Sequence, residues 1–441
     1  MRLYIETLGC PKNFNDSEGI GGIWENSGMT VTENPDDADV ILVNTCGFIN
    51  DAKKESIDKI FEMANYIEES GGEKILAVSG CLSQRYGDEL FEEMPEVDIF
   101  LGVNDYERFP DAVRNFKKGK REKFFSCNPD EFTEFSCRRT DEIPYTATLR
   151  IAEGCNNRCA YCVIPQIRGG YRSRPMEKIL EEAETLSLKG SREIILIAQD
   201  VTEYGRDIYG KLCLPELLRK LCRIEKLKWI RLMYCYEDKI SDELIDVMAS
   251  EDKICDYIDI PLQHVSDSVL KSMNRHSTSK SIKDTLNRLR KAIPGIHIRT
   301  TLITGFPGES DEDFEKLLDF VETERFERLG VFAYSQEEGT AAADMECQIE
   351  EEIKSQRADC IMRRQIEISR EINEAKVGNT IEVIVDGADE EGAYIGRSQY
   401  DAPEIDNTVI FKSESELKIG DMVKVNITDA FDYDLVGRME E

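Results

Sequence analysis

Histidine is nearly absent from this sequence, and long apolar runs are missing altogether. The three His among 441 residues are too few to favour a zinc site with mixed Cys and His ligands. No stretch approaches the roughly 18 apolar residues that a membrane helix needs. The first residues also lack the cleavage pattern that is typical of a signal peptide. We therefore expect a cytoplasmic protein without a membrane partner.

Positive charge is the third shortage. The chain has 56 Lys and Arg against 88 Asp and Glu, which gives a formal net charge of −32. Nucleic-acid binding depends on clustered Lys and Arg, so we do not expect direct RNA binding to dominate. The 14 Cys are spread over a chain long enough for two or three domains, whereas disulfide frameworks belong to short secreted domains. We expect these thiols to remain reduced.

Three of the cysteines form a compact motif. Cys155, Cys159 and Cys162 follow a β-rich run that ends at Ala152, and their spacing is C-x3-C-x2-C. Thiolates are the usual ligands of iron–sulfur clusters, and three of them can bind three irons of a four-iron, four-sulfur cluster. The fourth iron then remains open to another ligand. The alternatives are a zinc knuckle with a distant fourth ligand, or unrelated free thiols.

The spacing of this motif, with Tyr161 just before the last cysteine, resembles that of the radical S-adenosylmethionine (SAM) enzymes. The resemblance implies that the open iron binds SAM, and that an electron from the cluster splits SAM to a 5′-deoxyadenosyl radical.

A second cysteine triplet is predicted in the N-terminal part, which alternates short strands and helices. Each of three expected strands leads into a cysteine: Arg2–Thr7 into Cys10, Val40–Asn44 into Cys46, and Ile75–Ser79 into Cys81. If the strands are parallel neighbours, their carboxyl ends share one edge of a sheet, where α/β proteins bind ligands. The three cysteines would then form a second three-thiolate site. The alternative is three scattered core cysteines.

The central part repeats a strand–helix unit six times, which indicates an incomplete parallel (β/α)6 barrel. The expected strands are Ala147–Ala152, Ile194–Ala198, Trp229–Met233, Tyr257–Pro261, Ile298–Thr304 and Gly330–Tyr334. The fifth strand leads into Gly305, Pro307 and Gly308, where the main chain can pass close to the adenosyl part of SAM. Gln199 offers a polar group at the end of the second strand. We therefore expect these four residues to contact SAM.

A charged helical segment, Glu346 to Lys376, leads into short β runs that predict a small C-terminal β-barrel. The expected runs are Ile381–Val385, Tyr394–Ile395, Val409–Phe411 and Met422–Ala430.

The whole chain resembles the methylthiotransferase family of radical SAM enzymes. The N-terminal motifs that carry the resemblance are Gly9-Cys10-Pro11-Lys12-Asn13, Asn44-Thr45-Cys46-Gly47-Phe48-Ile49 and Gly80-Cys81-Leu82-Ser83-Gln84-Arg85-Tyr86. The resemblance implies an α/β domain at 1–140, a radical SAM partial barrel at 141–373 and a TRAM β-barrel at 374–441. It also implies two four-iron clusters. Cys155, Cys159 and Cys162 hold the radical cluster, and Cys10, Cys46 and Cys81 hold an auxiliary cluster.

Three motifs resemble the family branch that modifies an aspartate of small-subunit ribosomal protein number twelve. They are Cys10-Pro11-Lys12-Asn13, Cys46-Gly47-Phe48-Ile49 and Asp401-Ala402-Pro403-Glu404-Ile405-Asp406. From Glu374 to Glu441 there are six Lys and Arg against seventeen Asp and Glu, which suits a basic protein better than RNA. We expect Glu404 and Asp406 to help bind that protein, free or in the ribosomal particle. The alternatives are modification of a transfer-RNA adenosine and a non-catalytic iron–sulfur redox protein.

On this reading the radical removes a hydrogen from the aspartate β-carbon, and sulfur from the auxiliary cluster and a methyl group from a second SAM follow. An external electron donor is required. We further expect one of Arg168, Arg172 and Arg174 to grip the substrate carboxylate, unless these arginines pair with protein acids or bind SAM.

The segment Met233-Tyr234-Cys235-Tyr236-Glu237 departs from the family pattern, which has a proline there, and leaves the shape of that loop open. The remaining cysteines are predicted not to be ligands: Cys127, Cys137, Cys213, Cys222, Cys235, Cys255, Cys347 and Cys360.

Overall fold

The computed structural model describes residues 1–126, 135, 138–139 and 145–440, so Cys127 and Cys137 lie outside the described residues. The chain divides into two compact units. Unit 1 comprises Met1–Glu142, Ala152–Arg172 and Glu337–Thr340, and unit 2 comprises the rest. The boundaries at 140 and 373 remain predictions.

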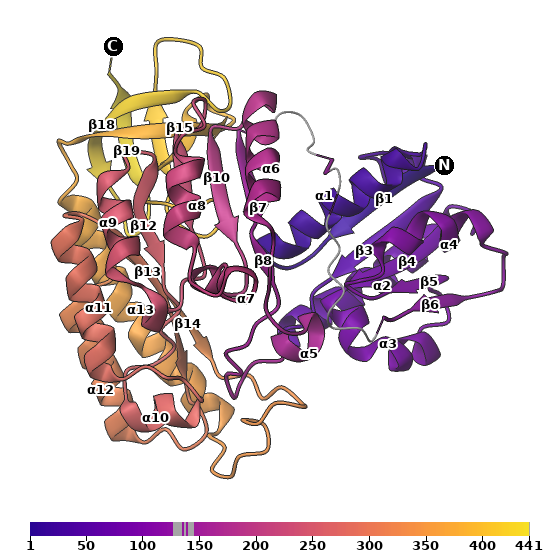
Figure 1. The fold of residues 1–441 in the computed structure, drawn as a ribbon, viewed down its shortest axis with the longest axis horizontal. Coiled ribbons are helices and arrows are strands. Elements are labelled where there is room, and N and C mark those ends of the chain that lie inside the picture. Colours follow the sequence, from indigo (N-terminus) through magenta and orange to yellow (C-terminus); the bar gives the residue numbers. More distant parts are fainter. Residues whose placement is uncertain (127–134, 136–137, 140–144, 441) are drawn as a thin grey trace. The chain divides into compact units, whose positions relative to one another are not determined.

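Unit 1 contains a six-stranded sheet in which all neighbouring strands are parallel (Figure 1). Its order is β2-β1-β3-β4-β5-β6. The strands are β1 (Arg2–Thr7), β2 (Thr30–Val31), β3 (Val40–Thr45), β4 (Ile75–Gly80), β5 (Ile99–Leu101) and β6 (Glu122–Phe124). The three strands that we predicted are therefore adjacent and parallel, as the convergence of their cysteines requires.

Helices cover both faces of this sheet, because the strands are apolar on both sides. Residues of α1 (Pro11–Asn26) and α4 (Phe109–Asn115) pack on one face, and residues of α2 (Asn50–Glu69) and α3 (Cys81–Glu93) on the other. The cysteine-rich segment packs into the core beneath α1 and α4 through Val163 and Ile167. Val163 directly precedes the short helix α5 (Ile164–Arg168), and Ile167 lies within it. This packing fixes the radical-cluster motif to unit 1.

Unit 2 contains the predicted six-stranded parallel sheet, in the order β14-β13-β12-β11-β10-β7. Its strands are β7 (Thr146–Arg150), β10 (Glu193–Ile197), β11 (Trp229–Leu232), β12 (Ile254–Asp259), β13 (His297–Thr304) and β14 (Arg328–Ala333). The main helices between them are α6 (Met176–Lys189), α8 (Leu214–Leu221), α9 (Asp242–Ser250), α10 (Asp267–Ser272), α11 (Ser279–Ala292) and α12 (Asp311–Glu324).

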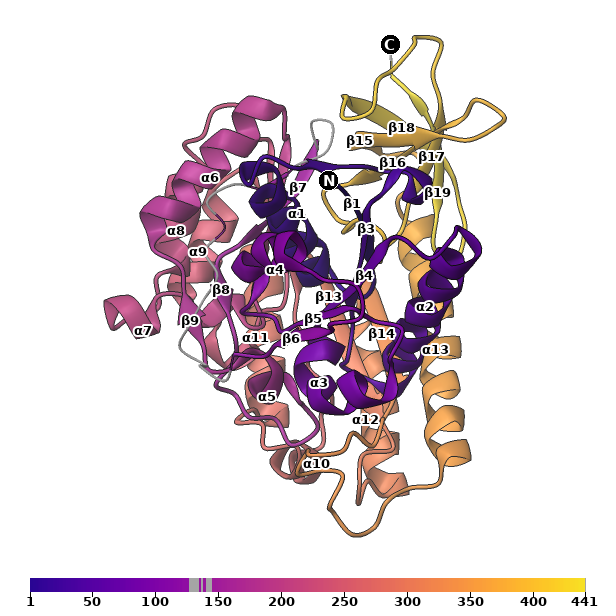
Figure 2. The ribbon, with the colours of Figure 1, turned by 90° about the vertical axis from the view of Figure 1, so that its right-hand side faces the viewer.

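The long helix α13 (Glu351–Glu374) leads into a closed five-stranded β-barrel (Figure 2). A small barrel was predicted here, with four of these five strands. The barrel strands are β15 (Thr380–Ala388), β16 (Tyr394–Ser398), β17 (Val409–Lys412), β18 (Met422–Ala430) and β19 (Leu435–Met439). Ile384, Ala402 and Met422 of this barrel pack against sheet residues such as Trp229 and Tyr257.

None of the helices in the described part of the chain combines the length and the apolar character that crossing a bilayer requires.

Candidate metal and cofactor site

The N-terminal cysteines lie where three adjacent strands of unit 1 end. Cys10 precedes α1 and follows β1, Cys46 follows β3, and Cys81 is the first residue of α3 after β4. Cys46 and Cys81 are buried, and Cys10 is half-buried. One edge of the sheet therefore carries all three thiols.

These three thiols are close enough to influence one another. Burial, with the neighbouring Cys81 and Cys10 thiols adding to its effect, raises the pKa of Cys46 to about 12. Gly9 has a φ of +96°, and a Cβ built there would lie 2.8 Å from Cys46 Cβ. A side chain at position 9 would thus collide with the triplet, which explains the glycine beside Cys10.

The donor set fits a thiolate-bound cluster. Among the residues that the structure describes, no group of His, Cys, Asp or Glu side chains surrounds a single metal ion. In a four-iron cluster each cysteine binds a different iron, so the thiols need to face a common space rather than one point. Thiols with raised pKa values would lose their protons on binding iron.

The second triplet occupies the loop that precedes α5. Cys155, Cys159 and Cys162 are half-buried, and burial raises the pKa of Cys162 to about 12, with Cys159 and Cys155 adding to the effect. Backbone N–H groups lie 3.5 Å from two of the sulfurs, Asn157 N from Cys155 Sγ and Ile164 N from Cys162 Sγ. The loop therefore presents three thiols with backbone donors directed at them.

Arg168 does not lie free to grip a substrate, contrary to the carboxylate-clamp prediction. Its side chain is 3% exposed, and Nη1 lies 2.8 Å from Asp16 Oδ2 and 3.3 Å from Glu153 Oε2. Nη2 donates to Asn13 Oδ1 at 2.9 Å and to Cys81 Sγ at 3.3 Å. Burial raises the pKa of Cys81, and the Arg168 guanidinium opposes that rise.

The other two arginines of this segment also bind the protein itself. Arg174 pairs with Glu182 at 2.7 Å and donates to Arg150 O, and Arg172 donates to the carbonyl oxygens of Gly170 and Arg168. The alternative that we left open, pairing with protein acids, describes Arg168 and Arg174. Asp16 lies 152 positions before Arg168, so no local pattern could reveal that pair, whereas Glu182 follows Arg174 by only eight residues.

The loop after β13 is held by a residue that the sequence analysis missed, Glu309. Its Oε2 accepts hydrogen bonds from Gly305 N at 2.8 Å and Phe306 N at 3.3 Å, and its Oε1 lies 2.7 Å from Arg357 Nη1. Gly305 has a φ of +71°, and a Cβ there would lie 2.2 Å from Lys354 Cγ. Pro307 is buried and Gly308 is exposed. The loop conformation thus depends on one carboxylate, which binds two backbone N–H groups of the loop through one oxygen and Arg357 through the other.

Gln199 lies on the same edge of the unit 2 sheet, at the end of β10, and β11 and β12 separate it from the Gly305 loop. The adjacent Asp200 is buried and pairs with Lys239 at 2.6 Å, a partner that the sequence did not indicate. In the loop after β11, Tyr234 has a φ of +59°, and Cys235 is buried. Glycine usually occupies such a conformation, so this departure from the family pattern has a distinct backbone shape.

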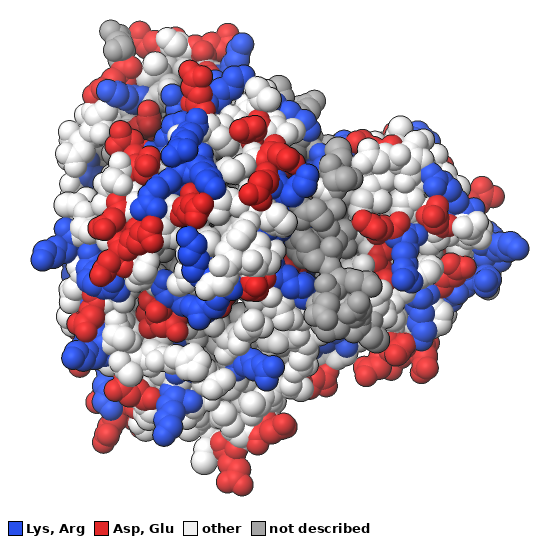
Figure 3. Space-filling model, viewed as in Figure 1, with Lys and Arg blue, Asp and Glu red and all other residues white. Residues whose placement is uncertain are grey.

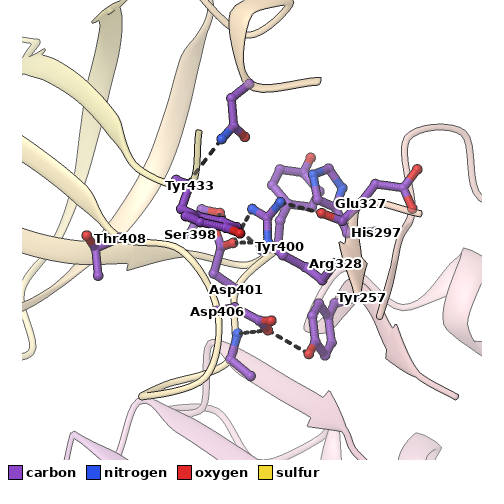
Figure 4. A network of polar contacts seen from close by, with 12 residues as sticks. Tyr257, His297, Glu327, Arg328, Ser398, Tyr400, Asp401, Asp406, Thr408 and Tyr433 are labelled. Carbon is purple, nitrogen blue, oxygen red and sulfur yellow. Dashed lines mark hydrogen bonds and ion pairs between the residues drawn. The ribbon is translucent and has the colours of Figure 1, made fainter. Parts of the chain in front are cut away.

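The acidic segment Asp401–Asp406 is largely a junction between the β-barrel and the sheet (Figure 4). Asp401 Oδ1 lies 2.9 Å from Arg328 Nε, and Asp406 Oδ2 lies 2.7 Å from the Tyr257 hydroxyl. Both carboxylates are buried, so our prediction that Asp406 helps to bind a substrate protein is wrong. Glu404 is exposed.

Surface charge is mixed over the helices of unit 2. Acidic and basic side chains alternate on the face shown in Figure 3 rather than gathering by sign.

Three family models match successive parts of the chain. The model described as "Uncharacterized protein family UPF0004" matches residues 2–102, the radical SAM superfamily matches 149–321, and the TRAM domain matches 377–439. Membership of the radical SAM superfamily implies a four-iron cluster and SAM as cofactors.

Full-length relatives identify the family more narrowly. The ribosomal protein uS12 methylthiotransferase RimO of Clostridium kluyveri is 49% identical over 438 residues, which cover 99% of this chain and 98% of the relative. The RimO protein of Lachnoclostridium phytofermentans is 48% identical over 442 residues and is covered completely, as is this chain. The chain belongs to the RimO family. It is thus a radical SAM methylthiotransferase by family.

Two solved structures share the fold of this RimO-family chain at low identity. The radical SAM methyltransferase TsrM of Kitasatospora setae has a TM-score of 0.56 at 13% identity, with 75% of this chain and 72% of TsrM covered. The cobalamin-dependent radical SAM enzyme OxsB has a TM-score of 0.52 at 14% identity, with 83% and 56% covered. These similarities concern the fold alone.

Proposed function

We propose that this chain adds a methylthio group to the β-carbon of an aspartate in ribosomal protein uS12. The observation that carries the proposal is the 48–49% identity to RimO proteins over essentially the full length of both chains. The two cysteine triplets, each gathered at one place in unit 1, support it. Non-catalytic electron transfer would require neither the six-unit sheet nor the appended barrel.

In this proposal Cys155, Cys159 and Cys162 hold the radical cluster, and Cys10, Cys46 and Cys81 hold the auxiliary cluster. Gly305, Pro307, Gly308 and Gln199 contact SAM. When bound, the two clusters and SAM would supply a carbon-centred radical, a sulfur atom and a methyl group. No protein side chain provides this chemistry.

The side chains of the protein bind and orient. The C–H bond to be replaced is not acidic, so the task of the protein is positioning rather than proton transfer. Glu309 maintains the loop that contacts SAM, since it accepts from Gly305 N and Phe306 N while Arg357 neutralises its charge. Most of the polar groups around Glu309 are buried, which keeps water away from these bonds.

The acidic C-terminal barrel favours a basic protein substrate over a nucleic acid. Seventeen Asp and Glu against six Lys and Arg would repel phosphates, whereas they attract the cations of a ribosomal protein. We therefore rank the uS12 aspartate above a transfer-RNA adenosine. An external reductant must supply the electrons.

The deciding experiment is mass spectrometry of uS12 after anaerobic incubation with the reconstituted protein, SAM, a sulfide source and a chemical reductant. Free uS12 and isolated small ribosomal subunits are tested in parallel with a bulk transfer-RNA sample. We expect addition of SCH2 to one aspartate of uS12 in at least one form. Modification of transfer RNA alone would overturn the proposal.

A further inference from the structure

Arg168 connects the two cysteine triplets within unit 1. It is the last residue of α5, six residues after Cys162, and its guanidinium lies at the end of the sheet that carries Cys81. One of its partners, Glu153, precedes Cys155 by two residues. A single side chain therefore contacts both the segment that leads into the radical-cluster motif and a predicted ligand of the auxiliary cluster.

Two carboxylates are enough to balance the charge of this guanidinium. Asp16 and Glu153 are both buried and both lie against Nη1. The other nitrogen, Nη2, faces Asn13 Oδ1 and Cys81 Sγ. The hydrogen bond from Nη2 to Cys81 Sγ is therefore not needed to balance the charge of Arg168, and it calls for another role.

Asn13 fixes the direction of that second nitrogen. Its Nδ2 donates to Leu8 O at 2.8 Å and to Thr45 O at 3.0 Å, so its amide joins the chain after β1 to the end of β3. Its Oδ1 is then left to accept from Arg168 Nη2 at 2.9 Å. The planar guanidinium, held at both edges, places an N–H group 3.3 Å from the sulfur of Cys81.

A hydrogen bond to a cluster-ligating thiolate makes the cluster easier to reduce, because it stabilises the more negatively charged reduced state. The guanidinium also offsets the charge of Asp16 and Glu153, so its removal would leave two buried carboxylates near the cluster and make the cluster harder to reduce. We propose that Arg168 is a positioning residue that fixes the radical-cluster segment against Cys81 and raises the reduction potential of the auxiliary cluster. This inference rests on the proposed auxiliary cluster at Cys10, Cys46 and Cys81.

The test measures that potential directly. In a background where Cys155, Cys159 and Cys162 are Ala, the reconstituted protein should hold only the auxiliary cluster. Iron content and an EPR-monitored redox titration are compared for this protein and for Arg168→Gln and Arg168→Lys. We expect the midpoint potential to become more negative in both variants. The shift should be larger for Gln, which lacks the charge, than for Lys, which keeps a charge but not the planar fork.

Arg174→Gln is the matched control, because Arg174 is also buried and paired with a glutamate, Glu182, but belongs to unit 2, whereas Cys81 belongs to unit 1. It should leave the potential unchanged. An unchanged potential in Arg168→Lys with iron retained would overturn the inference, as would an equal shift in Arg174→Gln. Loss of the cluster from Arg168→Lys but not from Arg174→Lys would support the anchoring role. If the background protein itself binds no iron, the proposed auxiliary site fails instead.

Discussion

Glu309 shows how one side chain determines a loop conformation. It is 4% exposed, and its two oxygens are bonded to the Gly305 loop and to Arg357 of α13. A carboxylate that accepts from backbone N–H groups and from a guanidinium forms charge-assisted hydrogen bonds, which are the stronger kind. The loop and the helix are thereby connected through a single group.

Replacing this carboxylate should weaken SAM binding. In Glu309→Gln the charge that balances Arg357 is lost, and the amide cannot accept at both ends as the carboxylate does. Charged hydrogen bonds contribute about 1.5–3 kcal/mol, so we expect the Kd for SAM to rise roughly 10-fold or more. Isothermal titration of the cluster-loaded protein measures it. Glu352→Gln, at an exposed acid on α13, is the control and should bind SAM normally.

The cysteine triplets make a separate prediction about iron. Reconstituted protein should hold about eight irons per chain, from two four-iron clusters. Alanine at Cys155, Cys159 and Cys162 should leave about four and abolish formation of 5′-deoxyadenosine. Alanine at Cys10, Cys46 and Cys81 should also leave about four but retain that product. Iron analysis and chromatography measure both, and full iron in the second variant would contradict the auxiliary-site assignment.

At the scale of secondary-structure elements, the sequence predicts all six strands of the unit 2 sheet but only β1, β3 and β4 of the unit 1 sheet. The strands β2, β5 and β6 were missed because they are only two or three residues long. The predicted Ile298–Thr304 differs from β13 by one residue at its start. The prediction failed for β19, since its short segment contains Gly437 and becomes a strand only by pairing with β17 and β18. Long-range pairing decides such segments, and local propensity does not.

The partners of Arg168 and Arg328 could not be predicted from the sequence either, because they too are distant along the chain. Arg168 meets Asp16 and Cys81 only after the chain has folded, and Arg328 meets Asp401 across 73 positions. The cysteine spacing, in contrast, is local and predicted the Cys155–Cys162 motif directly. The exposed-acid interpretation of Asp406 failed because an aspartate in a polar segment gives no local sign of burial.

The barrel–sheet junction makes a stability prediction. Burial alone would raise the pKa of Asp401, but Arg328 and Lys376 lower it to about 2. Its ionised form therefore stabilises the fold above the ordinary pKa of 3.8, and this stabilisation is lost as the pH falls toward 2. Asp401→Asn leaves Arg328 without its buried partner, so unfolding should become easier by about 3–5 kcal/mol at neutral pH.

Tryptophan fluorescence can measure this effect locally. The chain has two Trp, and Trp229 lies in the cluster between the sheet and the barrel, so Trp24→Phe leaves Trp229 as the reporter. Urea unfolding of Asp401→Asn in that background should occur at lower urea than in the parent. The difference should shrink between pH 3.8 and about 2. A difference that persists at the lower pH would contradict the role of the ion pair.

At the scale of the whole molecule, we expect the acidic residues of the C-terminal barrel to attract the substrate more than those elsewhere on the surface. Glu390, Glu391, Glu414 and Glu416 are exposed on the C-terminal barrel. Changing all four to Gln should raise the KM for free uS12 several-fold at low salt, with a smaller effect at physiological ionic strength because screening weakens exposed charges. SAM cleavage without substrate should be unaffected. Steady-state kinetics at two salt concentrations measure both.

A variant with the same change in net charge distinguishes location from total charge. Glu55, Glu62, Glu68 and Glu69 are exposed on α2. Their conversion to Gln should leave the KM for uS12 close to that of the unchanged protein. An equal rise of the KM for uS12 in both variants would mean that total charge, and not the barrel, attracts the substrate.

The charged junction between the barrel and the sheet also restricts how the C-terminal module can be exchanged. Glu193 pairs with Arg397, and Arg231 donates to the backbone oxygen of Gln399, beside the pairs already described. A chimera that receives a barrel from another methylthiotransferase would lose Arg397 and bring in foreign groups opposite Glu193 and Arg231 of the sheet. Such a chimera tests substrate choice only if its sheet residues are transplanted together with the barrel, because the acids that we propose to attract the substrate and the residues that dock on the sheet belong to the same module.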